Sequence, residues 1–186
     1  MPPLAFVLWT TARPGHSRGT VTEVYDALLR VRLACPDDWL DRAIATLGPA
    51  GLVVDPGAGV GISIAPGRQV SELVDEWSVE SLPHLLVGAW QHTVAVGPWV
   101  VPGISPCARC VAASTFDDGE RVRPGPPPAA LLTLAAGWAA RDMADWARGA
   151  TPSTWLCSWA FDHSPLPRNR RWERHPYCGC SWFEMA

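Results

Sequence analysis

The chain has 186 residues, of which 48% are hydrophobic and 18% charged, and its formal net charge is −3. This composition is typical of a folded protein and excludes an intrinsically disordered chain. The slightly acidic balance gives no general attraction to nucleic acid. No apolar run reaches the roughly 18 residues that a membrane-spanning helix needs, and residues 1–9 lack the basic segment of a secretory signal. We therefore expect a cytoplasmic protein of one domain, without a nucleic-acid or membrane partner.

Strand and helix patterns alternate along the chain. In chain order we expect a strand over 4–9, a turn-rich loop over 10–19, a helix over 20–29, a helix over 37–47, strands over 51–55 and 60–65, a helix over 69–81, strands over 84–90 and 93–101, a loop over 114–128, a helix over 129–148, and closing strands over 153–161 and 171–175. Alternation of this kind predicts an α/β domain with a mixed sheet.

Four of the six cysteines come as two close pairs, Cys107 with Cys110 and Cys178 with Cys180. Each pair sits on a turn marked by proline or glycine. Two close thiolate pairs suit a tetrahedral Zn²⁺ site with Zn–S bonds of about 2.3 Å. Four protein ligands leave no open position, so the metal would be structural. The spacing alone also allows a disulfide or redox pair, or unrelated buried thiols.

The residues around these pairs resemble a known family. The segments are VGPWVVPGISPCARC over 96–110, PHLLVG over 83–88 and RRWERHPYCGC over 170–180. They are similar to ocin-ThiF-like proteins, the zinc-tetracysteine, ThiF-related cyclodehydratase partners that bind precursor leader peptides in thiazole/oxazole-modified microcin (TOMM) biosynthesis. The resemblance implies one truncated or degenerate ThiF-like, Rossmann-like domain over 1–186. Its divergent α/β part would be 1–80 and its zinc-bearing part 81–186.

The same resemblance implies an accessory function. The chain would be a non-catalytic subunit of a bacteriocin-type modification system that binds the leader peptide, docks a YcaO cyclodehydratase, or does both, and it could form a homodimer. In that family the YcaO partner uses ATP to phosphorylate the backbone amide during cyclodehydration of Cys, Ser or Thr. Two alternatives stay open: a ThiF-like adenylating enzyme, and a zinc-stabilised scaffold that only holds other proteins together.

ATP use by this chain is not expected. The loop over 10–19 stands where a ThiF-like fold holds its nucleotide glycines, and it lacks the G-x-G-x-x-G pattern. The glycines over 57–61 run into a strand pattern, which favours a turn over a phosphate loop. Cys35 and Cys157 lie in apolar stretches and are expected to be buried thiols rather than nucleophiles. His175 is expected to support the second cysteine pair rather than to bind the metal.

Two surfaces are candidates for partner binding. One is a stripe on the helix over 129–148, made of Leu132, Ala136, Ala139, Met143 and Trp146. The alternative is that this stripe packs on the domain's own sheet. The other surface is a cluster of arginines around one tryptophan, with the members Arg168, Arg170, Arg171, Trp172 and Arg174. It would dock an acidic peptide or partner, unless it is a solvated strand whose arginine stems cover apolar surface.

Overall fold

The computed structural model describes residues 28–118 and 125–180, so the strand over 4–9, the loop over 10–19 and residues 20–27 of the helix expected over 20–29 lie outside the described residues. The described residues contain one seven-stranded sheet with the order β2-β1-β3-β4-β5-β6-β7. β2, β1, β3 and β4 are parallel, and β4 to β7 are antiparallel. The strands are β1 (Leu29–Ala34), β2 (Leu52–Val54), β3 (Gly61–Pro66), β4 (His84–Trp90), β5 (Thr93–Val100), β6 (Cys157–Phe161) and β7 (Arg168–Arg171).

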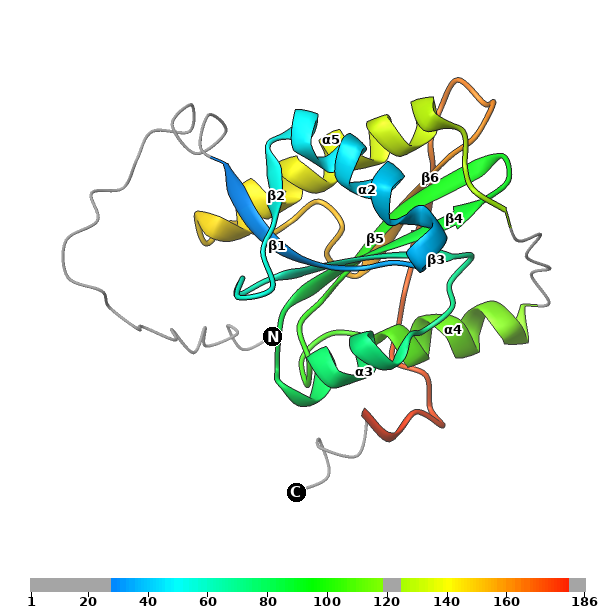
Figure 1. Ribbon diagram of the computed structural model, residues 1–186. Coiled ribbons are helices and arrows are strands. Elements are labelled where there is room, and N and C mark those ends of the chain that lie inside the picture. Colours follow the sequence, from blue (N-terminus) through cyan, green and yellow to red (C-terminus); the bar gives the residue numbers. More distant parts are fainter. Residues whose placement is uncertain (1–27, 119–124, 181–186) are drawn as a thin grey trace.

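Helices cover both faces of this sheet. α2 (Leu40–Leu47) and α5 (Ala129–Ala147) lie on one face, and α3 (Glu72–Val79) and α4 (Ala108–Asp117) lie on the other (Figure 1). Two short 3-10 turns, η1 (Asp37–Trp39) and η2 (Gly48–Ala50), flank α2. The mixed α/β architecture expected from the sequence is therefore confirmed. Among the described helices, none has the length and apolar character needed to cross a membrane.

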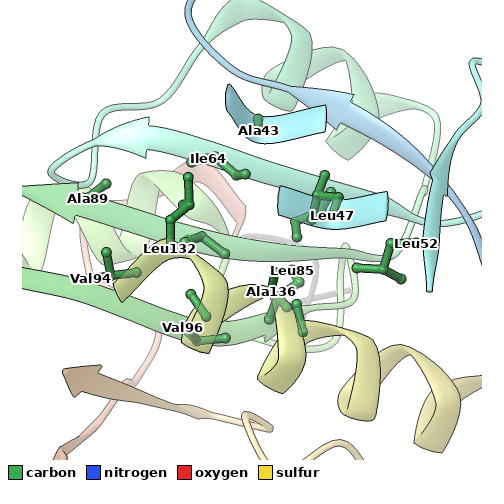
Figure 2. Packing of buried hydrophobic residues seen from close by; sticks show 14 of the residues in the cluster. Ala43, Leu47, Leu52, Ile64, Leu85, Ala89, Val94, Val96, Leu132 and Ala136 are labelled. Atoms are coloured by element: carbon green, nitrogen blue, oxygen red, sulfur yellow. The ribbon is translucent and has the colours of Figure 1, made fainter. Parts of the chain in front are cut away.

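The main core lies between the sheet and the layer of α2 and α5. Leu85, Val94 and Val96 point from the sheet toward Leu132 and Ala136 of α5 (Figure 2). Burying a large apolar side chain of this kind contributes about 1.5–3 kcal/mol. A smaller core on the opposite face joins α3 and α4 to the sheet. This packing fixes the position of α4, which carries the first cysteine pair.

Most expected elements are found near their predicted positions. The helix over 37–47 is η1 followed by α2, the strands over 84–101 form the β4–β5 hairpin, and the helix over 129–148 is α5. The glycines after Asp55 form a turn, in which the Gly57 backbone N–H donates to the Asp55 carboxylate at 2.8 Å. Gly61 then begins β3, and a Cβ there would lie 2.6 Å from the Trp77 ring, so the position requires glycine.

Four expected boundaries are wrong. The strand expected over 153–161 begins only at Cys157, because a turn occupies the preceding residues. Leu29 begins β1 instead of ending a helix, because Leu29, Val31 and Leu33 alternate with arginines at the period of a strand. The loop expected from residue 114 begins later, since α4 continues to Asp117. The last strand is Arg168–Arg171 and not 171–175. The paired residues of β7 end at Arg171, and the side chain of the next residue, Trp172, is buried.

Candidate metal centre

The fold brings the two cysteine pairs together. Cys107 is the residue that precedes α4, and Cys110 lies in its first turn, so both thiols are on one face of the helix. Cys178 and Cys180 follow a turn in which the Cys178 backbone N–H donates to the His175 carbonyl at 3.0 Å. All four sulfur atoms lie within 4.8 Å of one another. Segments about 70 residues apart in sequence thus converge on one cluster.

The spacing of the sulfur atoms fits a tetrahedral metal site. The Sγ–Sγ distances are 3.7 Å between Cys107 and Cys110, 3.5 Å between Cys107 and Cys178, and 3.2 Å between Cys110 and Cys180. Ligand sulfurs about 2.3 Å from a tetrahedral Zn²⁺ are roughly 3.8 Å apart. Three of the four thiols are buried, and Cys180 is partly exposed. The cluster can therefore hold a metal ion after only small movements of its side chains.

The electrostatics of the cluster favour a bound cation. The hydrogen bond with Cys107 lowers the pKa of Cys110 to about 4. The same hydrogen bond, together with burial, raises the pKa of Cys107, and burial raises the pKa of Cys180 to about 12. Four thiolates in mutual contact repel one another, so without a metal the cluster keeps protons. A divalent cation would replace these protons, as ligation of zinc requires the thiolate form.

Neighbouring side chains hold the two halves of the cluster in place. His175 Nε2 lies 2.8 Å from the Asp117 carboxylate at the end of α4, and His175 Nδ1 lies 3.3 Å from the Tyr177 backbone N–H that donates to it. His175 is thus occupied outside the ligand set, as expected from the sequence. The Arg109 guanidinium makes two hydrogen bonds to Asp75 of α3, at 2.8 and 2.7 Å. These contacts orient the two turns that carry the cysteines, and none of the side chains that make them is a cysteine of the cluster.

A tryptophan anchors the segment that leads to the second pair. The buried Trp172 donates its indole N–H to the Ser158 hydroxyl at 2.9 Å. The Arg68 guanidinium carbon lies 4.5 Å from the centroid of the Trp172 ring, and that of Arg170 lies 3.9 Å from it. Arg68 also donates to the Gly97 carbonyl at 3.2 Å. Sequence reasoning missed Arg68, because its partner Trp172 is more than one hundred residues away in the chain.

Only some side chains of the predicted arginine cluster are exposed at the protein surface. Trp172 is buried, Arg170 is half-buried and pairs with Asp118, and Arg174 donates to the Gly103 carbonyl. Arg168 and Arg171 are exposed, and Arg168 pairs with Asp162 at 2.8 Å. The alternative from the sequence, stems that cover apolar surface, therefore describes Arg170, whereas Arg168 and Arg171 remain available for a partner.

The helix stripe on α5 belongs to the core. Leu132 and Met143 are 4% and 2% exposed, and the Trp146 ring packs 5.3 Å from that of Trp99 on the sheet. The alternative left open by the sequence, in which the stripe packs on the domain's own sheet, is what the structure contains. Leu132, Ala136, Ala139 and Met143 are buried in this packing, and Trp146 is partly buried.

The sheet has a topological switch point between β1 and β3. The chain passes from β1 to β2 on one side and then returns to β3 on the other side of β1. Ligands of doubly wound sheets bind outside the carboxyl ends of the strands at such a point. The turn there begins with Cys35 and Pro36 and continues with Asp37 and Asp38, which open η1. Burial and these two carboxylates raise the pKa of the Cys35 thiol.

The turn over 35–38 can be compared with a phosphate-binding turn. The family resemblance places a nucleotide loop over 10–19, which lies outside the described residues, and the switch point of the described sheet is at residues 35–38. A phosphate-binding turn offers glycine backbone N–H groups and a positive field. Here two carboxylates stand at the same position, and their charge opposes phosphate.

Solved structures share this fold. The heterocyclase TruD aligns with a TM-score of 0.64 and 20% identity, covering 86% of this chain and 28% of TruD. A heterocyclase in complex with substrate and cofactor aligns with a TM-score of 0.63 and 18% identity, covering 85% of this chain and 26% of that protein. Escherichia coli MccB aligns with a TM-score of 0.52 and 17% identity, covering 68% of this chain and 40% of MccB.

The similarity at these identities is one of fold. No protein-family model matches the chain, and no curated protein matches it. The chain spans less than a third of the length of the two heterocyclases and two fifths of the length of MccB. It therefore has the architecture of one part of these larger proteins.

Proposed function

We propose that this chain is an accessory ThiF-like subunit of a ribosomal-peptide modification system. It would bind the leader peptide of a precursor, dock a YcaO-type cyclodehydratase, or do both. The observation that carries the proposal is the match to TruD over 86% of the chain. Two further similarities support it: one heterocyclase structure includes substrate, and one MccB structure, with a TM-score of 0.50, includes MccA.

The cysteine cluster would serve this function as a structural zinc site. Its four ligands leave no open coordination position, so a bound Zn²⁺ would not contact substrate. The metal would join the turn before α4 to the C-terminal turn at Cys178. Thiols in mutual contact persist in a reducing compartment, which supports a cytoplasmic location.

The chain would leave ATP chemistry to its partner. Asp37 and Asp38 place negative charge at the switch point, where a nucleotide-binding sheet presents donors to phosphate. A metal held by four thiolates of the cysteine cluster would have no open coordination position for a substrate. Substrate delivery and partner docking are functions that need only a surface.

Reconstitution tests the proposal. The genes that neighbour the gene for this chain are searched for a YcaO enzyme and a precursor peptide. The two products are purified, and ring formation is followed by the loss of one water mass per ring. We expect ring formation to require this chain, and pull-downs to show that it binds the precursor or the YcaO enzyme. Pyrophosphate exchange by the chain alone should be absent. If the YcaO enzyme works equally well without the chain, and neither protein binds it, the accessory function is wrong. Exchange activity would instead favour an adenylating enzyme.

A further inference from the structure

The strand β7 forms the end of the sheet. It pairs with β6 on one side, with Arg170 opposite Ser158 and Asn169 opposite Trp159. No strand within residues 28–118 and 125–180 pairs with its other side. The Trp172 backbone N–H donates to the Leu156 carbonyl at 2.8 Å, so the backbone groups of Trp172 face β6. Since antiparallel residues alternate in the direction of their backbone groups, the N–H and C=O of Asn169 and Arg171 point away from β6.

Arginine side chains flank these outward backbone groups on both faces of the sheet. Arg168 shares a face with Arg170, which contacts the layer of α4 through Asp118. Arg171 lies on the opposite face, beside Asn169. The Arg168 side chain is 68% exposed, and Arg171 is exposed. The edge thus offers unpaired hydrogen-bonding groups between two exposed positive charges, in a chain whose net charge is −3.

These charges decide which kind of strand can pair with the edge. An antiparallel second copy would place Arg168, Arg170 or Arg171 opposite itself, or Arg168 opposite Arg170, and like charges across two strands repel. A strand with carboxylates would instead form opposite-charge pairs. Because Arg168 and Arg171 are three residues apart and lie on different faces, the matching strand carries carboxylates three positions apart, which likewise point to different faces.

We propose that the outer edge of β7 binds an acidic, extended peptide segment as an additional strand of the sheet. The backbone of Asn169 and Arg171 would provide the hydrogen bonds, and Arg168 and Arg171 would select the charge. Arg168 would leave Asp162 to pair with a peptide carboxylate, or its guanidinium would pair with both carboxylates at once. This inference rests on the proposed function in that the peptide would be an acidic stretch of the precursor.

A synthetic peptide tests the edge directly. The probe is a labelled peptide of about ten residues with a central run of glutamates between valines and threonines, and binding is measured by fluorescence anisotropy. We expect saturable, salt-sensitive binding. Replacing the glutamates by glutamines should weaken it. Methylating alternate backbone amides of the acidic peptide should also weaken it about tenfold or more, because methylation removes strand hydrogen bonds and leaves the charge unchanged.

Variants of the protein separate the backbone contribution from the charge. Arg171→Pro removes an outward N–H that makes no bond to β6, and should weaken binding about tenfold. Arg171→Gln keeps that N–H and should weaken binding less. The matched control is Arg141→Gln, which removes a 52% exposed arginine from α5 and should leave binding unchanged. Circular dichroism and metal content verify that each variant is folded.

The outcomes are distinct. Equal binding of the methylated and unmethylated peptides, or the same loss in Arg141→Gln as in Arg171→Gln, would overturn strand addition, as would the absence of binding. If ring formation needs the chain but Arg171→Pro supports it fully, the β7 site is wrong and the accessory function stands. If the acidic peptide binds β7 but the chain is dispensable for ring formation, the edge site stands and the accessory function fails.

Discussion

Asp142, buried in the middle of α5, accepts two hydrogen bonds from Thr154 through one carboxylate oxygen, from the backbone N–H at 2.9 Å and from the hydroxyl at 2.5 Å. Its other oxygen accepts two from Ser153, at 3.0 and 2.8 Å. A buried carboxylate is tolerated only when such donors replace water. Asp142 therefore fixes the segment that enters β6, and β6 in turn positions β7.

We expect Asp142→Asn to destabilise the fold by about 2–4 kcal/mol. The amide NH₂ of asparagine would face two donors that the carboxylate oxygen now satisfies. Urea unfolding measures the effect. The matched control is Asp145→Asn on the same helix, where the ion pairs with Arg141 and Arg148 lose one charge but an amide oxygen can still accept from Arg148; the expected cost is smaller than for Asp142→Asn. Equal losses in the two variants would contradict the role assigned to Asp142.

Metal removal should weaken the fold strongly. Purified protein is expected to carry about one zinc per chain, by elemental analysis. Chelation should lower the melting temperature, because structural zinc in small domains contributes on the order of 10 kcal/mol of folding free energy. Cys178→Ser should lose a large part of this stabilisation, since it removes one ligand from the C-terminal turn.

Cys157→Ser is the control for this experiment. Cys157 is a free, partly exposed thiol on β6 that donates to the Ser153 carbonyl at 3.2 Å, away from the cluster. A serine hydroxyl can make the same contact, so zinc content should not change. A preparation that is fully folded and free of metal would show that the four cysteines are not a structural metal site.

His84 makes stability depend on pH. Its side chain is fully buried, and Nδ1 lies 2.9 Å from the Leu82 carbonyl, so Nδ1 carries the proton. Nε2 has no hydrogen-bond partner among the described residues. Burial lowers the pKa of His84 below its usual value of 6.5. Below that value the unfolded chain takes up a proton that the folded chain does not, so stability should fall as the pH decreases from 6.5 toward the lower folded pKa.

Urea unfolding across this pH range, with zinc content measured at each point, tests the role of His84. His84→Asn can still donate to the Leu82 carbonyl but does not titrate in this range, and its stability should depend less on pH than that of the wild type. Identical slopes in the two proteins, with zinc retained, would show that His84 does not contribute.

The sequence predicted the elements whose local signals agree with their tertiary surroundings. The β4–β5 hairpin and α5 have strong periodic patterns. The spacing within the two cysteine pairs is enough to predict a cluster that can hold a metal ion. β1 was missed because its alternating residues follow a stretch with helical spacing, and only pairing with β2 and β3 decides between the two. α4 was missed because its amphipathic pattern is short and follows a turn that ends at Cys107.

Contacts between distant segments could not be predicted. The arginine cluster divides into a buried part and an exposed part because Trp172 enters the core beside Arg68 and Ser158. No local sequence pattern predicts the contact of Trp172 with Arg68 and Ser158. The hydrogen bonds of Asp142 could not be predicted either. In the sequence it is one of several polar residues of a helix, and only the fold brings Thr154 next to it.

The turn after β1 leads to a prediction about nucleotides. ATP binding by a doubly wound sheet requires donors that face the phosphates at the switch point. In this chain Asp37 and Asp38 stand there in the first turn of the following helix. We expect no binding of ATP in calorimetry and no nucleotide-dependent rise in melting temperature, whether or not magnesium is present. Asp37→Asn with Asp38→Asn removes the repulsion but supplies no glycine turn, so it should not create binding.

If the wild-type chain binds ATP tightly and the double variant binds it more tightly still, the switch point is a nucleotide site. The chain would then be an adenylating enzyme rather than an accessory subunit.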